Sequence, residues 1–174
     1  MLSININKVT LSNINQLQII GRQTFYETFA DSNTETNMKT YLSKGFSTKK
    51  LKAELNDSNT EFYFATHNNS VIGYLKLNGG QAQTELHDNK ALEIERIYVL
   101  KHYHGKNIGQ LLFNKALQIA KLKKTDYVWL GVWEENTRAI NFYKKNGFVA
   151  FNKHIFKLGN DEQTDIMMKL NLSY

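Results

Sequence analysis

Residues 90–133 place the strongest constraint on how this chain can fold. KALEIERIYVL (90–100) is typical of a β-strand, residues 108–123 repeat apolar side chains at helical spacing, and DYVWLGVW (126–133) is again typical of a strand. A strand, a helix and a strand in succession make one crossover connection within a sheet. Helices, a hairpin and a β-rich end surround this crossover. We therefore expect an α+β sandwich around one mixed sheet of six to seven strands, flanked by four to five helices.

The remaining elements follow from shorter patterns of the same kind. Ser12 is a candidate N-cap for a first helix, whose apolar residues from Ile14 to Phe29 recur on one side. Asn68 and Asn69 separate two β-rich runs and predict a hairpin turn. Further helices are expected at residues 33–44, 47–57 and 137–145, and further strands at 6–10, 60–67, 70–78, 147–156 and 164–172.

Composition favours one domain over residues 1–174. The chain has 174 residues, 41% of them hydrophobic, and shows no repeat or low-complexity linker. It contains no cysteine, which excludes disulfides, thiolate zinc sites and a cysteine nucleophile. No secretory signal and no long apolar run are visible, so we expect a cytoplasmic protein that does not enter a membrane. The net charge of +6 suits an anionic ligand, either a phosphate-bearing cofactor or a nucleic acid.

The loop HYHGKNIG (102–109) joins the strand and the amphipathic helix of the crossover. The apolar stripe of this helix must lie on the sheet, which leaves its amino end facing the loop. Backbone N–H groups from Gly105 to Gly109 then lack helical acceptors, and with the helix dipole they form an anion site. The glycines let a bulky diphosphate approach the backbone; alternatively, they only shape a turn. Walker and GxGxxG patterns are absent.

Two segments, in order, resemble the motifs of the GCN5-related N-acetyltransferases (GNAT). The loop resembles motif A. That motif begins with Arg or Gln, continues with two residues of any type and a Gly, and ends after one further residue with Gly or Ala. His104 and Asn107 depart from the first two positions and Gly109 matches the last, while Asn tolerates the left-handed backbone that Gly would supply. The resemblance implies the GNAT fold, acetyl-CoA as cosubstrate and no metal. Motif B is matched within residues 135–148 by Asn136, Ala139, Phe142, Tyr143, Gly147 and Phe148.

Further segments resemble the PaiA-type subgroup, which is similar to spermidine/spermine N-acetyltransferases. This resemblance covers nearly the whole of residues 1–174 and implies transfer of an acetyl group to a primary amine, with a polyamine as the first choice. Because no cysteine is available for a covalent intermediate, direct attack in a ternary complex is the simpler route. The segments are NTETNMKTYL, FYF, GYLKLN, AQTE, ALEIERIYV, WLGVWEEN and HIFKLGNDEQTD.

Such a reaction needs a base, because an amine of pKa ~10 is mostly protonated at neutral pH. Strict alternation along the strand places Glu93 and Glu95 on one face, together with Ile97 and Val99. We favour Glu95, whose spacing before His104 resembles that in spermidine acetyltransferases. Glu93 corresponds to the glutamate of histone-type relatives and stays an alternative, and either carboxylate can instead belong to a structural ion pair.

The resemblance also implies the acid and the cofactor contacts. Tyr143 would protonate the leaving thiolate. The backbone of the strand end would pair with the pantetheine arm as an extra strand does, and an N–H near Val99 would polarise the thioester carbonyl. The expected cofactor contacts are Ile97, Tyr98, Val99, His104, Gly105, Lys106, Asn107, Ile108, Gly109, Gln110, Asn136, Tyr143 and Lys145.

The acceptor side is marked by scattered acids. Glu27, Asp31, Glu35 and Glu134 are the candidate contacts for a cationic amine. The overall charge of +6 argues against an acidic cleft unless acids gather locally. Two loop histidines, His102 and His104, lack a third ligand, so no metal is expected.

Other functions remain open at this point. A protein or peptide N-acetyltransferase would need an open peptide groove, and a non-catalytic regulator would bind acyl-CoA without transferring the acyl group. A nucleic-acid partner is not expected, because the lysines at positions 115, 121, 123 and 124 fit a solvated helix face. The sequence leaves a homodimer open.

Overall fold

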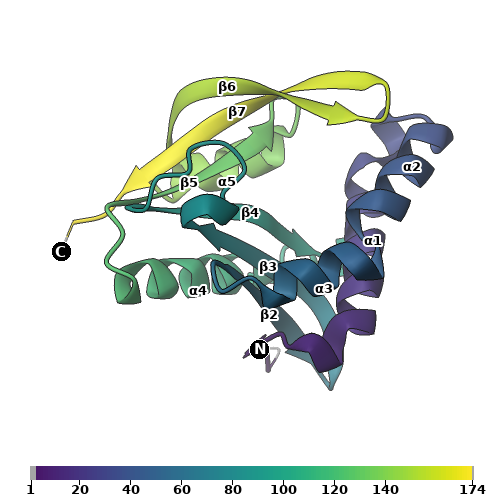
Figure 1. Ribbon diagram of the computed structural model, residues 1–174, viewed down its shortest axis with the longest axis horizontal. Coiled ribbons are helices and arrows are strands. Elements are labelled where there is room, and N and C mark those ends of the chain that lie inside the picture. Colours follow the sequence, from purple (N-terminus) through teal and green to yellow (C-terminus); the bar gives the residue numbers. More distant parts are fainter. Residues whose placement is uncertain (1–2, 174) are drawn as a thin grey trace.

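In the computed structural model, which describes residues 3–173, seven strands form one sheet with helices packed on it (Figure 1). Short 3-10 turns occupy residues 11–13, 30–32, 80–82 and 101–103. The elements are β1 (Asn5–Lys8), α1 (Ile14–Phe29), α2 (Glu35–Gly45), α3 (Thr48–Asn56), β2 (Thr60–His67), β3 (Ser70–Gly79), β4 (Ala91–Val99), α4 (Ile108–Leu122), β5 (Tyr127–Trp133), α5 (Thr137–Lys145), β6 (Val149–Leu158) and β7 (Asp161–Asn171).

The sheet has the order β1-β2-β3-β4-β5-β7-β6, and it is mixed as predicted. Only β4 and β5 pair in parallel, because α4 carries the chain from one to the other. Their pairing stops at Glu93 and Trp129, although β4 continues to Val99 and β5 to Trp133. The sheet therefore splits between its two central strands.

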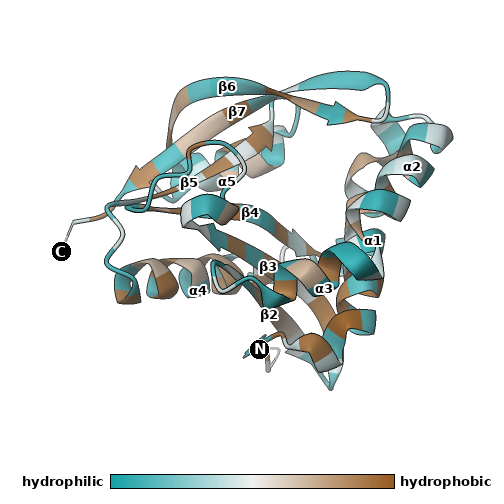
Figure 2. Ribbon diagram, in the orientation of Figure 1, coloured by the Kyte–Doolittle hydropathy of each residue, from teal (hydrophilic) through white to brown (hydrophobic). Residues whose placement is uncertain are grey.

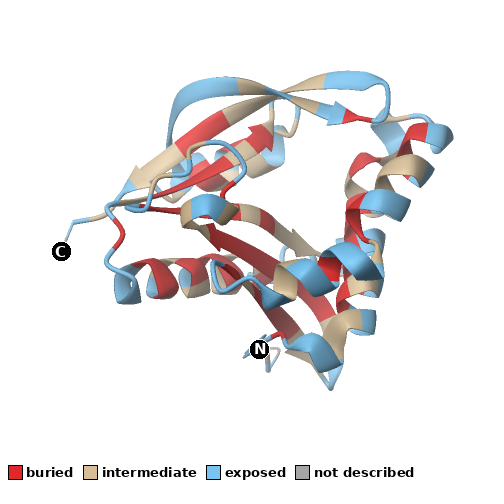
Figure 3. Ribbon diagram, viewed as in Figure 1, coloured by how far each residue is buried: buried red, intermediate tan, exposed pale blue. Residues whose placement is uncertain are grey.

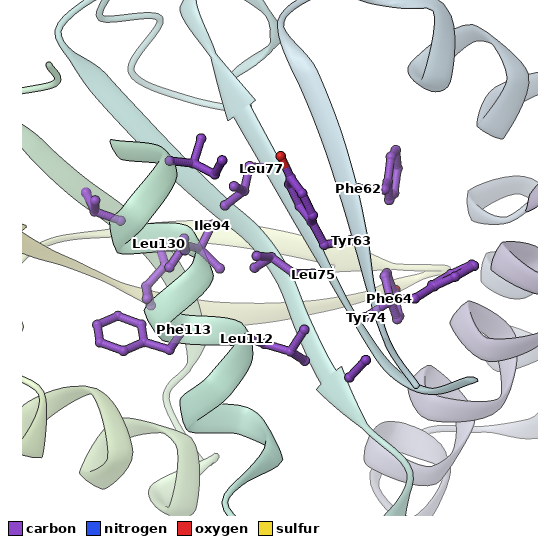
Figure 4. Packing of buried hydrophobic residues seen from close by; sticks show 14 of the residues in the cluster. Phe62, Tyr63, Phe64, Tyr74, Leu75, Leu77, Ile94, Leu112, Phe113 and Leu130 are labelled. Atoms are coloured by element: carbon purple, nitrogen blue, oxygen red, sulfur yellow. The ribbon is translucent and has the colours of Figure 1, made fainter. Parts of the chain in front are cut away.

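The core lies on both sides of the sheet. Leu75, Leu77 and Ile94 point toward α4, whereas Phe62 and Tyr74 point away from it toward the N-terminal helices (Figure 4). In Figure 2, α1 and α4 alternate between brown and teal along their length, as expected of helices that bury one side. The α4 side chains buried in this way are Ile108, Leu112, Phe113, Ala116, Ile119 and Ala120.

Most predicted elements are confirmed with small changes at their ends. Asn68 and Asn69 both take positive φ angles in the hairpin turn between β2 and β3. The prediction that Ser12 caps the first helix is wrong. Residues 11–13 form a 3-10 turn, so α1 begins at Ile14 with Asn13 in the N-cap position. The side-chain oxygens of Thr34 and Ser47 do cap α2 and α3.

The β6–β7 hairpin runs along the top of Figure 1, and its tip reaches α2. Asn37 of α2 donates from Nδ2 to Asp161 Oδ2 over 2.7 Å and accepts from the backbone N–H of Asn160. Much of β6 is exposed, whereas β4 and β5 are largely buried (Figure 3). None of the helices within residues 3–173 is long and apolar enough to cross a lipid bilayer.

Candidate active site

Two adjoining cavities open where β4 and β5 separate. The loop-side pocket, of about 600 Å³, is bordered by residues 103–105 and 107–110 and by α5. The sheet-side pocket, of about 470 Å³, is bordered by β4 on one wall and by β5, β7 and β6 on the other. The two pockets share the lining residues Ile97, Tyr98, Asn136, Ala139 and Tyr143.

The loop-side pocket presents backbone N–H groups at the start of α4. Asn107 is the N-cap, but its φ is 64° and its side chain makes no capping bond. The backbone N–H groups of residues 105–110 meet no acceptor within residues 3–173. A Cβ added to Gly105 or Gly109 would meet nothing within 4 Å. Open space and unpaired donors thus coincide at a helix N-terminus, which is the arrangement that binds a diphosphate.

His104 bridges the loop, the end of β4 and α5. Its Nε2 donates to the carbonyl oxygen of Val99 over 2.7 Å, so its Nδ1 is the acceptor for Nη1 of Arg138. Desolvation lowers the pKa of His104 and the charge of Arg138 adds to this effect, so the neutral ring is favoured. Arg138 also lines the loop-side pocket and is a contact that sequence reasoning missed.

The two expected lysine contacts differ in position. Lys145, the last residue of α5, lines the loop-side pocket. Lys106 instead places Nζ 4.7 Å from the ring centre of Tyr103 and is not part of the lining.

Helix α5 places two residues between the pockets. Asn136 caps the helix by accepting from the backbone N–H of Ala139 over 3.2 Å, which occupies its Oδ1. Tyr143 follows two turns later on the same face and lines both pockets. Burial raises the pKa of Tyr143, so its phenol stays protonated at neutral pH. Gly147, with φ at +90°, ends the helical segment.

A β-bulge in β4 changes the alternation predicted from the sequence. Leu77 of β3 opposes Ile94 and Lys76 opposes Arg96, so Glu95 is an extra residue in β4. Glu93 and Glu95 still share a face, and both accept from Nδ2 of Asn78. Ile97 and Val99 lie on the opposite face, because the bulge shifts the alternation by one residue. The prediction that all four share one face is therefore wrong.

Glu93 is held by neutral donors. Its carboxylate accepts from the backbone N–H of Thr84 over 2.9 Å, from the Thr84 hydroxyl, and from Asn78 over 3.0 Å. Burial raises the pKa of Glu93, and the hydrogen bonds from Thr84 and Asn78 only partly oppose it. Glu93 thus has more affinity for a proton than an exposed glutamate.

Glu95 is held by cations instead. Its Oε2 lies 2.5 Å from Nζ of the buried Lys76, and its Oε1 lies 3.6 Å from Nε of Arg96. Lys76 also pairs with Glu54 of α3 over 2.9 Å. Burial alone would raise the pKa of Glu95, but the charges of Lys76 and Arg96 outweigh it and lower the pKa to about 2. The structure gives Glu95 the surroundings of an ion-pair partner.

The four predicted acceptor acids do not line the sheet-side pocket. Glu27 lines the loop-side pocket, where its carboxylate accepts from the backbone N–H of Lys101 over 2.8 Å. Asp31 and Glu35 are exposed before and at the start of α2, and Glu134 lies 3.6 Å from Lys153. The acids that do line the pocket are Glu85, Glu93, Glu95 and Asp165.

The structure explains two segments whose role the sequence left unassigned. In AQTE, Gln83 ties the loop together by donating to the carbonyls of Gly80 and Asp88 and accepting from the indole of Trp129. This fixes the neighbouring Thr84 against Glu93. In NDEQTD, Asp161 joins the hairpin tip to α2, and Asp165 enters the pocket wall. Within residues 3–173, no group of three or more His, Asp or Glu side chains is arranged to hold a metal ion.

Comparison with known proteins identifies a family and several relatives to which this chain is similar. Residues 22–148 match the model of the acetyltransferase (GNAT) family. An uncharacterized N-acetyltransferase of Lactobacillus delbrueckii subsp. lactis is 37% identical over 169 residues, which cover 97% of this chain and 98% of that relative. Spermidine N(1)-acetyltransferase of Thermoplasma acidophilum is 29% identical over 151 residues, 84% of this chain and 89% of that relative.

A solved structure has the same fold. The crystal structure of PaiA N-acetyltransferase from T. acidophilum in complex with coenzyme A matches with a TM-score of 0.82 and 24% identity. The match covers 98% of this chain and all of that chain. The fold expected from the two sequence motifs is confirmed.

Proposed function

This chain belongs to the GNAT family of acetyltransferases and depends on acetyl-CoA, and from that premise we propose that its acceptor is the primary amine of a polyamine such as spermidine or spermine. The local concentration of acids carries this proposal. The chain as a whole has a net charge of +6, yet four carboxylates line the sheet-side pocket. Glu95 is paired with Lys76 and Arg96, and Lys157 of the same lining lies 3.1 Å from Glu162 outside it, which leaves Glu85, Glu93 and Asp165 for a ligand. A polycation fits such a pocket.

Aromatic side chains suit the apolar part of the same acceptor. Phe25, Phe29 and Trp133 line the same pocket as the acids. Methylene segments of a polyamine would pack on these rings, while its ammonium groups face the carboxylates. The spermidine acetyltransferase named above, at 29% identity, supports the same acceptor class.

The loop-side pocket fits the cosubstrate. The unpaired N–H groups of residues 105–110 would hold its diphosphate, with Arg138 and Lys145 as nearby cations. The separated edge of β4 from Ile97 to Val99 would pair with its amide-bearing arm. When bound, acetyl-CoA supplies an acetyl group activated as a thioester.

We assign the base to Glu93 in place of Glu95. The acceptor nitrogen can form its bond to the acetyl carbon only after losing a proton, so a carboxylate of raised pKa is the better acceptor for that proton. Glu95 is committed to Lys76 and Arg96, which makes it a weak base. As the carbon–sulfur bond breaks, Tyr143 protonates the sulfur from its position between the two pockets, and the second proton of the attacking nitrogen restores the phenol.

An acceptor screen tests this function directly. Because the chain has no cysteine, a thiol-reactive reagent detects only the coenzyme A that is released on transfer. The purified protein is incubated with acetyl-CoA and spermidine, spermine, lysine or a mixture of peptides, and products are identified by mass spectrometry. We expect acetylated spermidine or spermine at a higher kcat/KM than acetylated lysine or peptide. Faster peptide acetylation would replace the polyamine proposal, and cosubstrate binding without any transfer would indicate a regulator.

A further inference from the structure

Asp165 is a carboxylate of the sheet-side pocket that the proposed chemistry leaves unused. It lies on β7, in register with Trp133 of β5 and His154 of β6. Its side chain is 15% exposed and receives no hydrogen bond within residues 3–173. Its nearest charged neighbour is Nε2 of His154, 3.7 Å from Oδ2, which is beyond hydrogen-bonding distance. Asp165 is therefore mostly shielded from water, and no hydrogen-bond donor lies beside it among the described residues.

A glycine lies beneath this carboxylate. A Cβ built on Gly131 of β5 would lie 2.9 Å from Cε1 of His154 and 3.4 Å from Oδ2 of Asp165. The side chains of Asp165 and His154 therefore pack over the backbone of Gly131, and a side chain there would displace the imidazole of His154. All three residues line the sheet-side pocket.

The acids of the sheet-side pocket differ in the groups that contact them. Glu93 has three hydrogen bonds and Glu95 has Lys76 and Arg96, whereas Asp165 has only the distant imidazole. Burial raises the pKa of Asp165 to about 6, and His154 offsets this only in part. Within residues 3–173, the Nδ1 atom of His154 is itself buried without a hydrogen-bond partner. Shielding an anion from water with only a distant imidazole beside it costs free energy, so a cation supplied by a ligand would bind favourably here.

We propose that Asp165 binds a second ammonium group of the acceptor, one that is not acetylated, and so selects amines that carry two or more cationic nitrogens. This inference rests on the proposed function and adds the residue that sets its specificity. Glu93 and Asp165 lie on β4 and β7, two strand spacings apart in the sheet order. They also lie four residues apart along the strands, because Glu93 pairs with Trp129 and Asp165 pairs with Trp133 of β5, so their Cα atoms are roughly 16 Å apart. The terminal nitrogens of extended spermidine lie ~11 Å apart by standard bond lengths, and the two side chains, which both line the pocket, would span the remaining distance. A monoamine has no group to reach the second carboxylate.

The test compares matched acceptors on matched variants. Asp165→Asn keeps the shape of the side chain and removes its charge. Asp126→Asn makes the same substitution at an exposed position just before β5, outside the pocket lining, and serves as the control. The measured quantity is the ratio of kcat/KM for spermidine to kcat/KM for n-butylamine. We expect Asp165→Asn to lower this ratio about tenfold or more, mainly through the KM of spermidine, and Asp126→Asn to leave it within twofold.

The outcomes separate this inference from the function on which it rests. If wild-type protein acetylates no amine, the proposed function fails and the inference fails with it. If wild-type protein acetylates spermidine and Asp165→Asn keeps the wild-type ratio, only the inference is overturned. An equal fall in kcat for both acceptors also overturns it, because that result assigns Asp165 to catalysis. Should Asp165→Asn not fold, Asp165→Ser provides the same comparison, with circular dichroism as the check.

Discussion

The two pockets bind by different means. The loop-side pocket is lined by the end of β4 with the following loop and the start of α4, by Asn136 and α5, and by Glu27 and Thr28 of α1. The sheet-side pocket is lined by residues from α1, α2, the loop after β3, α5 and every strand from β4 to β7. The first offers unpaired backbone N–H groups beside Arg138 and Lys145, and the second offers carboxylates and aromatic rings.

The difference explains which substitutions each pocket tolerates. His104 and Asn107 depart from the family pattern, yet the loop still points its amides into the pocket, because Asn107 adopts the left-handed backbone that glycine usually supplies. On the sheet side, the acids differ in their surroundings, because Glu93 has hydrogen bonds from Thr84 and Asn78, Glu95 has ion pairs, and Asp165 has only His154 at 3.7 Å. Exchanging one of them therefore changes the chemistry of the pocket. Recognition of the cosubstrate depends on backbone shape, and recognition of the acceptor depends on side-chain identity.

The largest expected effect distinguishes the two neighbouring glutamates. Glu93→Gln should lower kcat by about a thousandfold and remove the ascending limb of the pH–rate profile, because it removes the proposed base. Glu95→Gln should keep that limb, since Glu95 with a pKa of about 2 is already ionised across the measured range. Steady-state rates from pH 5 to 9 check both variants. A lost limb in Glu95→Gln with a retained limb in Glu93→Gln would reverse the assignment.

Tyr143 lies where the two pockets meet, so its removal should affect chemistry without affecting either binding step. We expect Tyr143→Phe to lower kcat on the order of a hundredfold, while the Kd of acetyl-CoA changes less than about twofold. Calorimetry measures the Kd and the thiol assay measures kcat. Turnover equal to that of the wild type would remove the tyrosine from the reaction.

Gly109 tests the backbone character of the loop side. A side chain at this position points into open space, so Gly109→Leu should raise the Kd of acetyl-CoA about tenfold by filling the diphosphate site. The melting temperature should hold or rise, because leucine favours helix over glycine by roughly 0.8 kcal/mol. Gly109→Ala is the matched control, with a smaller effect expected. An unchanged Kd in Gly109→Leu would mean that the diphosphate binds elsewhere.

The smallest expected effect concerns stability on the sheet side. The pKa of Asp165 is raised from 3.8 to about 6, so the folded state loses stability as pH rises from about 4 through 6. Asp165→Asn should therefore melt a few degrees above the wild type at pH 7.5, and the difference should shrink steadily from pH 6 to pH 4. The other charged groups of the pocket are the same in both proteins, so they do not contribute to the difference. They are His154, Arg96, Glu93 and Glu95. Thermal melts of both proteins across this range measure the difference in melting temperature. A difference that does not change with pH would show that Asp165 is not responsible.

The loop-side pocket could be predicted because its determinants are local. The expected helix at residues 137–145 is confirmed, with Asn136 before it and Gly147 after it. The glycine-containing loop ahead of α4 is also where the sequence placed it. Contiguous residues fix such features through caps, periodicity and turn geometry, all of which are visible in one stretch of sequence.

The acceptor acids could not be predicted in the same way. The β-bulge at Glu95 cannot be predicted from the alternation of side chains along β4. It depends on how β4 pairs with β3 near Lys76. Asp165 reaches the pocket only because β7 pairs with β5 across a long separation in sequence. Acids near the motifs, such as Glu27 and Glu134, were the visible candidates. Tertiary pairing brought Glu85 and Asp165 into the pocket lining instead.

The order of the strands has a consequence for the sheet-side pocket. β7 follows β6 in the chain but lies inside it in the sheet, bonded to β5 on one side and to β6 on the other. β6 therefore touches the rest of the sheet only through β7, and the two strands join β5 as one hairpin. A shift of β7 along β5 would carry Asp165 of β7 and His154 and Phe156 of β6 together, while the loop ahead of α4 would keep its place.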